Sequence, residues 1–297
     1  MKVLVVVNPR AGRGRRGRSR DALTRALRSL SLDFDLVETE RPGHAAGIVA
    51  ACGPDHDGVL VVGGDGTLHE ALQSLDLERL RLAVLPWGSG NDFAWLHGWS
   101  PDPASCAARI AANGERRIDL GSWESDLQQG PARSGRFHNS VGLGFEAVVN
   151  HESHRVTAVR GPLIYGVALA RTLRRFRAYP VRMTWDSGAL EGDVALVTVA
   201  NGKRVGGAFL LAPDARTDDG RLDLVYAGRI GRLRMLSLLP RTLNGSHVRS
   251  RVVRTARTVT LHVAAPEGIP AYVDGEFLGM RLTSLALRVL PGALRSF

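Results

Sequence analysis

A buried strand, a glycine-rich turn and a helix follow one another within Val59–Leu72, and this arrangement constrains the fold more than any other feature. Val59–Val62 is a continuous apolar run, which is typical of a strand covered on both faces of a parallel sheet. The next segment, Gly63–Thr67 (GGDGT), has three glycines that let backbone N–H groups come close to a ligand. Because the positive end of the following helix dipole points at the same place, the segment predicts an anion site. The alternative is a plain tight turn.

Strand and helix patterns alternate through the first 121 residues. The strand patterns cover Val3–Val7, Phe34–Val37, Val59–Val62 and Leu82–Leu85, and the helical patterns cover Asp21–Leu32, Ala45–Ala51 and Leu68–Leu75. This alternation predicts an N-terminal domain with a doubly wound α/β fold over residues 1–121, whose ligands bind at the carboxyl ends of the strands.

The pattern changes after residue 121. Ser122–Arg136 is polar and contains Gly, Pro and Ser, which predicts a loop or a hairpin. Beyond it, strand patterns cover Val181–Trp185, Val194–Val199, Leu222–Tyr226, Val259–Val263 and Leu285–Leu290, and helical patterns cover Leu163–Phe176 and Leu233–Leu243. We therefore expect a second, mainly β domain over residues 122–282.

The composition is that of an ordinary globular protein with a basic bias. The 297 residues include 39 Lys+Arg and 29 Asp+Glu, so the net charge is +10, and nearly all the basic residues are arginines. Such a charge suits nucleic acid, an anionic membrane or phosphorylated small molecules, and does not choose among them. The two cysteines are too few for a disulfide framework, and no apolar run reaches about 20 residues, the length that spans a bilayer. We expect a soluble cytoplasmic protein.

Two further glycine-bearing loops follow predicted strands, Asn8–Gly12 after the first strand and Pro86–Phe93 after another. Loops at the carboxyl ends of strands in an open α/β sheet converge on one crevice, so three such loops predict a phosphate-rich nucleotide site. Asp65 inside the glycine turn would repel a phosphate directly. It suits such a site if it acts through Mg²⁺ or water, or belongs to the reacting centre.

Taken together, these segments closely resemble the diacylglycerol kinase catalytic family, which includes soluble bacterial lipid kinases and the sphingosine and ceramide kinases. The GGDGT turn alone is less specific, because NAD kinases and phosphofructokinases carry close versions of it. The third loop and the late Asp274-Gly275-Glu276 make the match specific. The other matching motifs are Asn8-Pro9-x-Ala11-Gly12, Ile118–Gly121, Asn139-x-x-Gly142-x-Gly144-Phe145 and Pro213–Leu224.

The resemblance implies a two-domain kinase with ATP in the cleft between an α/β domain and a β-sandwich domain. It also implies that the C-terminal segment, Thr283–Phe297, returns to the first domain. The ATP contacts of the family fall on Asn8, Pro9, Arg10, Ala11, Gly12, Thr39, Gly63, Gly64, Asp65, Gly66, Thr67, Leu68, His69 and Ser89.

The resemblance further implies a Mg²⁺ site at the turn Asp218–Gly220, with ligands from the carbonyls of Arg216 and Arg221 and the side chain of Asp219. The alternative is an ordinary turn between strands. Two positions depart from the family pattern. Ser89 stands where relatives usually have Thr, and Glu146 stands where an Asp is common.

Four carboxylates beside glycine-bearing turns fit the needs of phosphoryl transfer, which are positioning, metal neutralisation of the phosphates and a base for the attacking hydroxyl. We expect Glu276 to be the general base, as the family resemblance also implies, with Asp119 orienting it or its water. Asp65 and Asp92 would hold the metal or its waters. The alternatives are a helix N-cap for Asp92 and a turn residue for Asp119.

These features predict an ATP- and Mg²⁺-dependent lipid kinase that phosphorylates the hydroxyl of a diacylglycerol-like or sphingoid lipid. The alternatives are an NAD kinase-like small-molecule kinase and a non-enzymatic basic protein that binds nucleic acid or membrane; no nucleic-acid-binding motif supports the latter. The arginines of residues 171–177 and 241–257 would help the enzyme dock on the anionic inner membrane face. An exposed sheet edge in the second domain would permit a homodimer.

Overall fold

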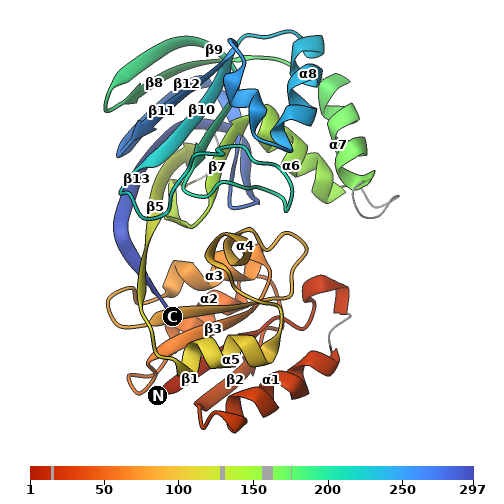
Figure 1. Cartoon of the computed structure of the whole chain (residues 1–297). Coiled ribbons are helices and arrows are strands. Elements are labelled where there is room, and N and C mark those ends of the chain that lie inside the picture. Colours follow the sequence, from red (N-terminus) through yellow and green to blue (C-terminus); the bar gives the residue numbers. More distant parts are fainter. Residues whose placement is uncertain (15–16, 128–130, 156–162, 175) are drawn as a thin grey trace. The chain divides into compact units, whose positions relative to one another are not determined.

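Figure 1 shows the computed structural model of the chain, which describes residues 1–14, 17–127, 131–155, 163–174 and 176–297. The chain divides into two compact units. Unit 1 comprises Met1–Leu120 and Leu290–Phe297, and unit 2 comprises Gly121–Val289. No helix in the described ranges is both long enough and apolar enough to cross a membrane.

Unit 1 contains a parallel sheet in the order β13-β4-β3-β1-β2. Its strands are β1 (Lys2–Val7), β2 (Asp33–Glu38), β3 (Gly58–Gly63), β4 (Arg81–Pro86) and the end of β13 (Glu276–Ser296). Every residue of β3 is buried, as the unbroken apolar run predicts for a strand covered on both faces. β13 joins at the edge, where Ser296 pairs with Leu82 of β4.

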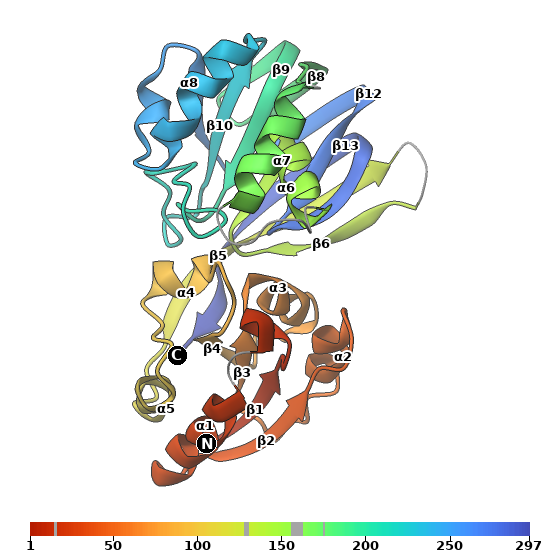
Figure 2. The same ribbon diagram turned by 90° about the vertical axis from the view of Figure 1, so that its right-hand side faces the viewer.

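The helices of unit 1 are η1 (Ala11–Gly14), α1 (Gly17–Ser29), α2 (His44–Ala50), α3 (Asp65–Ser74), α4 (Asp92–His97) and α5 (Pro103–Ala111). α1 packs against α5 and α2 against α3, and Figure 2 shows the two pairs on opposite sides of the sheet. Leucines at helical spacing, including Leu23 and Leu27 of α1, enter the core between sheet and helices. The predicted doubly wound α/β fold is confirmed.

Unit 2 is built mainly of antiparallel strands. They are β5 (Arg116–Leu127, which begins in unit 1), β6 (Arg133–Phe137), β7 (Ser140–Gly144), β8 (Tyr179–Trp185), β9 (Gly188–Ala200), β10 (Leu222–Gly228), β11 (Val253–Thr258), β12 (Thr260–Val273) and most of β13. The main order is β11-β10-β9-β7-β12-β13, while β8 pairs with β12 and β9, and β5 pairs with β13 and β6. The strands enclose an apolar core, which contains Val197, Leu224 and Leu261. The predicted mainly β second domain is confirmed.

The helices of unit 2 are α6 (Phe145–Arg155), α7 (Leu163–Arg174), α8 (Arg232–Thr242) and η2 (Ser246–Arg249). α7 and α8 fall where helices were predicted. Within the polar segment Ser122–Arg136, the ends of β5 and β6 pair as antiparallel strands, which agrees with the predicted hairpin, while residues 128–130 of this prediction lie outside the described residues. β7, α6 and β11 were not predicted. β7 (SVGLG) escapes a pattern search because three of its five buried residues are Ser or Gly, so the segment does not form the continuous apolar run that marks the other buried strands.

The C-terminal segment serves both units. Leu285 and Leu287 lie in the core of unit 2, and Ser284 Oγ donates a hydrogen bond to Asp126 Oδ2 at 2.7 Å. Leu294 and Phe297 lie in the core of unit 1. Of the segment Thr283–Phe297, which was expected to return to the first domain, the part Leu290–Phe297 therefore belongs to unit 1 and the rest to unit 2.

Candidate nucleotide site and catalytic carboxylates

The loops after β1, β3 and β4 lie side by side at the carboxyl ends of their strands. Asn8 N donates to Val62 O at 2.9 Å, and Trp87 N donates to Gly63 O at 2.8 Å. Thr39, at the end of β2, donates its N–H to Val7 O at 2.8 Å. The structure therefore brings the unit 1 residues of the expected nucleotide site together, because parallel pairing aligns the ends of all four strands.

Asn8 ties the first loop to the start of α3. Its Nδ2 donates to Thr67 Oγ1 at 2.9 Å, while its Oδ1 accepts the N–H of Arg10 at 3.0 Å and its carbonyl accepts the N–H of Ala11. Thr67 is buried in the first turn of α3. The side chain of Asn8 thus holds the backbone turn in place and leaves Arg10 exposed beside it.

The glycine turn is shorter than expected, because α3 begins at Asp65 rather than at Leu68. Gly64 is the N-cap and has extended backbone, so Gly66 and Thr67 already belong to the helix. The first N–H groups of a helix have no partner within it and carry the positive end of the dipole. The consequence is that the backbone of Gly64–Thr67 presents N–H groups where an anion would bind.

Gly64 and Gly88 bring the second and third loops into backbone contact. A Cβ atom on Gly88 would lie 2.4 Å from the Cα of Gly64, and one on Gly64 would lie 2.9 Å from the Cα of Gly88. Asn91 holds the third loop in this position, since its Oδ1 accepts the N–H of Gly88 and its Nδ2 donates to Gly88 O, both at 2.9 Å. Any side chain at either glycine would force the loops apart.

Gly88→Ala is expected to lower ATP affinity by about tenfold, because the loops must separate by a few tenths of an ångström or more and misplace the helix N–H groups. Isothermal titration with ATP measures the effect. Gly47→Ala is the matched control, because the new Cβ would meet nothing within 4 Å. Gly47 lies on the exposed face of α2, where alanine has a higher helix propensity than glycine. Unchanged ATP affinity in Gly88→Ala would contradict the idea that this backbone contact shapes the site.

Asp65 connects two helices. It lies in the first turn of α3, and its Oδ1 accepts the N–H of Phe93 in the first turn of α4 at 3.3 Å. The N-cap of α4 is Asn91, with a left-handed φ of 51°, and Asp92 is the buried first residue of that helix. The alternative reading of Asp92 as the N-cap is therefore wrong, because the chain enters the helix one residue earlier.

Asp119 lies within β5 and not in a turn, which excludes the alternative of a turn residue. Its carboxylate is buried, and Oδ1 accepts the N–H of Gly292 at 2.6 Å. This contact joins β5 to the returning C-terminal strand inside unit 1. Asp119 therefore has a clear structural partner, and its expected role toward Glu276 stays a prediction.

Asp274 and Gly275 form the two-residue turn between β12 and β13 in unit 2. Their φ values of 48° and 91° fit the type I′ hairpin turn that this dipeptide favours. The strand pairing brings Val273 opposite Glu276 directly after the turn, and Glu276 is exposed. The hairpin therefore displays the carboxylate of Glu276 at its tip.

The carboxylate of Asp274 anchors this hairpin. Oδ1 accepts the N–H groups of Asn139 at 2.9 Å and Ser140 at 3.0 Å, and Oδ2 accepts that of His138 at 2.9 Å. The side chain is fully buried. The sequence identified Asp274 only as part of a motif, because the aspartate-glycine pair carries no signal of its distant partners. Asp274 is a positioning residue for the segment that presents Glu276.

Partly buried Glu146 and fully buried Tyr272 form a second polar pair in unit 2. Tyr272 OH donates to Glu146 Oε1, and Thr198 Oγ1 donates to Glu146 Oε2 at 2.6 Å. The tyrosine ring fits because residue 142 is glycine, where a Cβ would lie 2.1 Å from a ring carbon. Burial raises the pKa of Glu146 to about 7, although both hydrogen bonds act to lower it. Burial also raises the pKa of Tyr272.

Glu146→Gln is expected to flatten the pH dependence of stability. The pKa of Glu146 rises from an ordinary value of 4.5 to about 7 on folding, so the folded state binds the proton more tightly. Between these two values the free energy of unfolding of the wild type should fall with rising pH by about 3 kcal/mol relative to the variant. Urea unfolding at several pH values measures this difference. A constant difference across the range would contradict the shift.

The predicted metal residues lie in a loop of unit 2 before β10. Asp219 Oδ1 accepts the N–H of Arg221 at 3.1 Å, and its Oδ2 lies 3.8 Å from Nη1 of Arg257. Arg216 pairs with Asp218 through Nε at 3.1 Å. Within the described ranges no group of three or more His, Cys, Asp or Glu side chains is arranged to hold a metal. One carboxylate with carbonyl oxygens is nevertheless an all-oxygen donor set, which suits Mg²⁺.

Comparison with known proteins covers both units. Residues 2–123 match the diacylglycerol kinase catalytic domain, and residues 139–297 match the YegS C-terminal NAD kinase beta sandwich-like domain. The chain is similar to a diacylglycerol kinase of Mycobacterium tuberculosis, with 32% identity over 93% of this chain and 89% of the relative. It is also 34% identical to a YegS-like lipid kinase candidate of Pseudomonas aeruginosa over 78% of this chain and 74% of the relative.

Solved structures agree with the sequence comparisons. A candidate diacylglycerol kinase from Bacillus anthracis superposes with a TM-score of 0.80 at 25% identity, covering 99% of this chain and 96% of the other. The similarity thus extends over both units and over the loops that carry the site. The chain belongs to the diacylglycerol kinase family.

Proposed function

We propose that this protein is a lipid kinase that transfers the γ-phosphate of ATP to the hydroxyl of a diacylglycerol-like or sphingoid lipid. The observation that carries the proposal is the contact of Gly64 with Gly88 beside the start of α3, in a domain of the diacylglycerol kinase family. Because residues 64 and 88 are glycines, neither places a side chain over the N–H groups at the start of α3. None of the relatives named above is an NAD kinase, so the NAD kinase-like alternative receives no support from them.

The residues of unit 1 bind and orient ATP. The N–H groups at the start of α3 hold phosphate oxygens, and the loop held by Asn8 places Arg10 where its charge offsets that of the triphosphate. Asp65 is negatively charged and would repel a phosphate directly. Its Oδ1 accepts the N–H of Phe93, which fixes the carboxylate where it would act through a metal ion. Mg²⁺, when bound, supplies the positive charge that neutralises the phosphates during transfer. Asp92 would contribute to the same metal or its waters.

Glu276 accepts the proton of the attacking lipid hydroxyl. Its carboxylate is exposed at the tip of the hairpin. Asp274, in the turn of the same hairpin, is held by hydrogen bonds from three backbone N–H groups. A general base must be held within hydrogen-bond reach of the hydroxyl, and a rigid turn provides that positioning. Asp119 would orient Glu276 or its water. A second Mg²⁺ ion, bound by Asp219 and the carbonyls of Arg216 and Arg221, would stabilise the loop before β10.

The lipid substrate places the enzyme at a membrane surface. We infer peripheral contact of a cytoplasmic protein with the anionic inner membrane face, because the chain carries a net charge of +10. Of the arginines expected to contribute, residue 175 lies outside the described residues. β11 is an end strand of the unit 2 order and would provide the edge for a homodimer.

A substrate panel tests the proposed function. The protein is incubated with radiolabelled ATP, Mg²⁺ and diacylglycerol, ceramide, sphingosine or NAD in separate reactions, and each product is identified by its mass. We expect a phosphorylated lipid and no NADP. Phosphorylation of NAD without any lipid product would overturn the proposal.

A further inference from the structure

Helix α8 in unit 2 exposes a row of large apolar side chains. Leu233 is 83% exposed, Leu236 is 43% exposed and Leu243, which follows the last turn, is 56% exposed. The helix buries a different set against the unit, namely Met235, Leu238 and Thr242. Unit 2 therefore buries only one of the two apolar faces of α8, and its folding does not account for the exposed one.

The exposed residues form a stripe. At 100° per residue, Leu233, Leu236, Pro240 and Leu243 fall within an arc of about 80°, and its centre lies roughly 150° from the centre of the buried row. We call these four residues the leucine stripe. Because the two faces are nearly opposite, the stripe points away from the core of unit 2, and Figure 1 shows α8 on the outside of the β9–β10 part of the sheet.

Arginines surround the leucine stripe. Residues 224–266 contain eight arginines and no Asp or Glu. On the helix surface Arg232 lies on one side of the stripe, and Arg234 and Arg241 lie on the other. Among the described residues, the hydrogen bonds of these three guanidinium groups go to neutral oxygens of Arg174, Ser250 and Ser246, so their charges are not offset by those partners.

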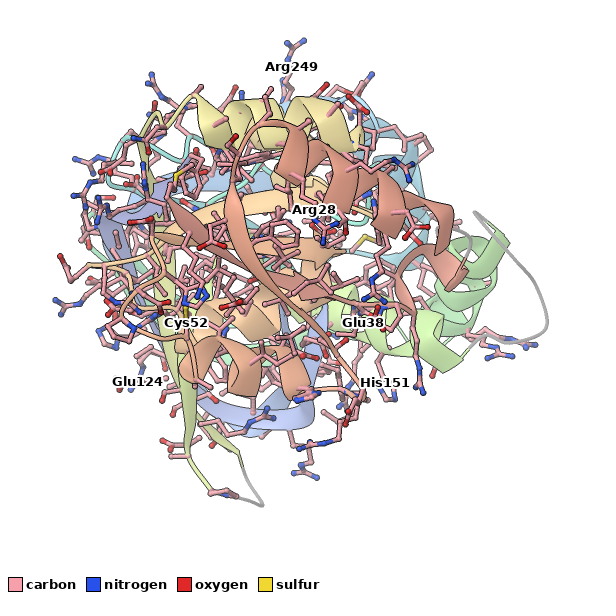
Figure 3. The ribbon with its side chains drawn as sticks, turned by 90° about the horizontal axis from the view of Figure 1, so that it is seen from below. Arg28, Glu38, Cys52, Glu124, His151 and Arg249 are labelled. Carbon is pink, nitrogen blue, oxygen red and sulfur yellow. The ribbon has the colours of Figure 1, made fainter. Side chains whose placement is uncertain are left out.

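The neighbouring segment adds to the same charge. η2 packs against α8, and Arg249 at its end and Arg251 just beyond are exposed. Figure 3 shows the side chain of Arg249 projecting away from the ribbon. The surface therefore combines an apolar stripe with cations on both of its sides, which is the composition of a helix that lies in a membrane interface.

We propose that the leucine stripe and its arginines dock α8 on an anionic lipid bilayer, with the leucines among the acyl chains and the guanidinium groups at the phosphates. Arginine suits this place because its apolar stem covers the leucines while its head reaches the lipid phosphates. A second copy of the same surface would bring like charges together, and a nucleic acid would gain nothing from exposed leucines. The inference rests on the proposed function and names the surface that meets the substrate membrane.

Vesicle co-sedimentation without ATP tests the surface. The wild type should bind vesicles of phosphatidylcholine with roughly a third phosphatidylglycerol, and bind pure phosphatidylcholine vesicles at least about tenfold more weakly. The double variant Leu233→Ser/Leu236→Ser should lose about tenfold or more in affinity, because it removes the apolar insertion. Arg232→Gln/Arg249→Gln should lose about twentyfold on the anionic vesicles, and less at high salt.

Matched controls lie on α1 and just after it, in unit 1. Leu30 is 42% exposed, close to Leu236, and Arg28 is an exposed arginine labelled in Figure 3. Leu30→Ser and Arg28→Gln should leave vesicle binding unchanged. All these positions are exposed, so thermal unfolding of each variant should match the wild type and thereby exclude misfolding as the cause.

The readouts separate this inference from the proposed kinase activity. Phosphorylation of a short-chain, water-soluble diacylglycerol should be unchanged in Leu233→Ser/Leu236→Ser, while phosphorylation of vesicle-embedded diacylglycerol should fall with the loss of binding. Wild-type binding that ignores anionic lipid, full vesicle binding by the stripe variant, or a wild-type dimer that this variant dissociates in light scattering would each overturn the docking surface. Vesicle binding with no phosphorylation of either lipid would instead overturn the kinase proposal.

Discussion

Glu276→Gln is expected to lower kcat for lipid phosphorylation by a factor of about 10² to 10⁴, the usual contribution of a general base. The amide keeps the size of the side chain but cannot take the proton of the lipid hydroxyl. Because Glu276 is exposed at the hairpin tip, the substitution should leave folding unchanged. The measurement is steady-state transfer from radiolabelled ATP to a short-chain diacylglycerol, together with the affinity for ATP, which should stay the same.

Glu267→Gln provides the control for the loss of a negative charge, since Glu267 is an exposed glutamate of β12 outside the expected site. It should retain wild-type kcat. Glu276→Asp should recover part of the lost rate, because a carboxylate returns at a slightly wrong distance. If Glu276→Gln turns over at the wild-type rate, Glu276 is not the base.

Asp274→Ala is expected to have the largest effect on stability. It removes the acceptor for the N–H groups of His138, Asn139 and Ser140, all of which are buried. Each buried donor left without an acceptor costs about 1–3 kcal/mol, and alanine is also strained at the left-handed φ of 48°. We expect a loss of about 3–5 kcal/mol in the free energy of unfolding, measured by urea denaturation.

Asp274→Asn separates the anchoring from the turn conformation. Asparagine tolerates the left-handed region and keeps one oxygen that can accept from Asn139 and Ser140, so we expect a loss of only about 1–2 kcal/mol. Its kcat should fall more than its affinity for ATP, because a looser turn misplaces Glu276 while unit 1 is unchanged. Equal stability of Asp274→Ala and the wild type would show that the three amides find other partners.

Local patterns were sufficient for much of unit 1. The strands before the loops at Asn8 and Gly63 are continuous apolar runs, which predict buried strands. The glycines that follow these runs predict where the chain leaves each strand. The same patterns located α7 and α8 in unit 2. The start of α3 was misplaced by three residues, because Asp65, Gly66 and Thr67 read as turn residues although the first turn of a helix accepts all of them.

Contacts between distant segments could not be predicted in this way. Asp274 meets the amides of His138–Ser140 more than 130 residues earlier, and Glu146 meets Tyr272 across 126 residues. Hydrophobic periodicity and turn residues give information about neighbours along the chain. They do not indicate which carboxylate will contact a strand that is distant in the sequence. The contact of Gly64 with Gly88 is likewise visible only once two strands are paired.

The sequence by itself therefore determined the two fold classes, the three converging loops and the family, because each depends on local residue patterns or on motifs. The tertiary structure alone decided which polar groups anchor the Glu276 hairpin and which leucines of α8 stay exposed. Leu233 and Leu238 are the same residue type in the same helix, and only packing decides that Leu238 is buried and Leu233 is exposed. The physical reason is that burial and remote hydrogen bonds are properties of paired and packed elements and not of any single segment.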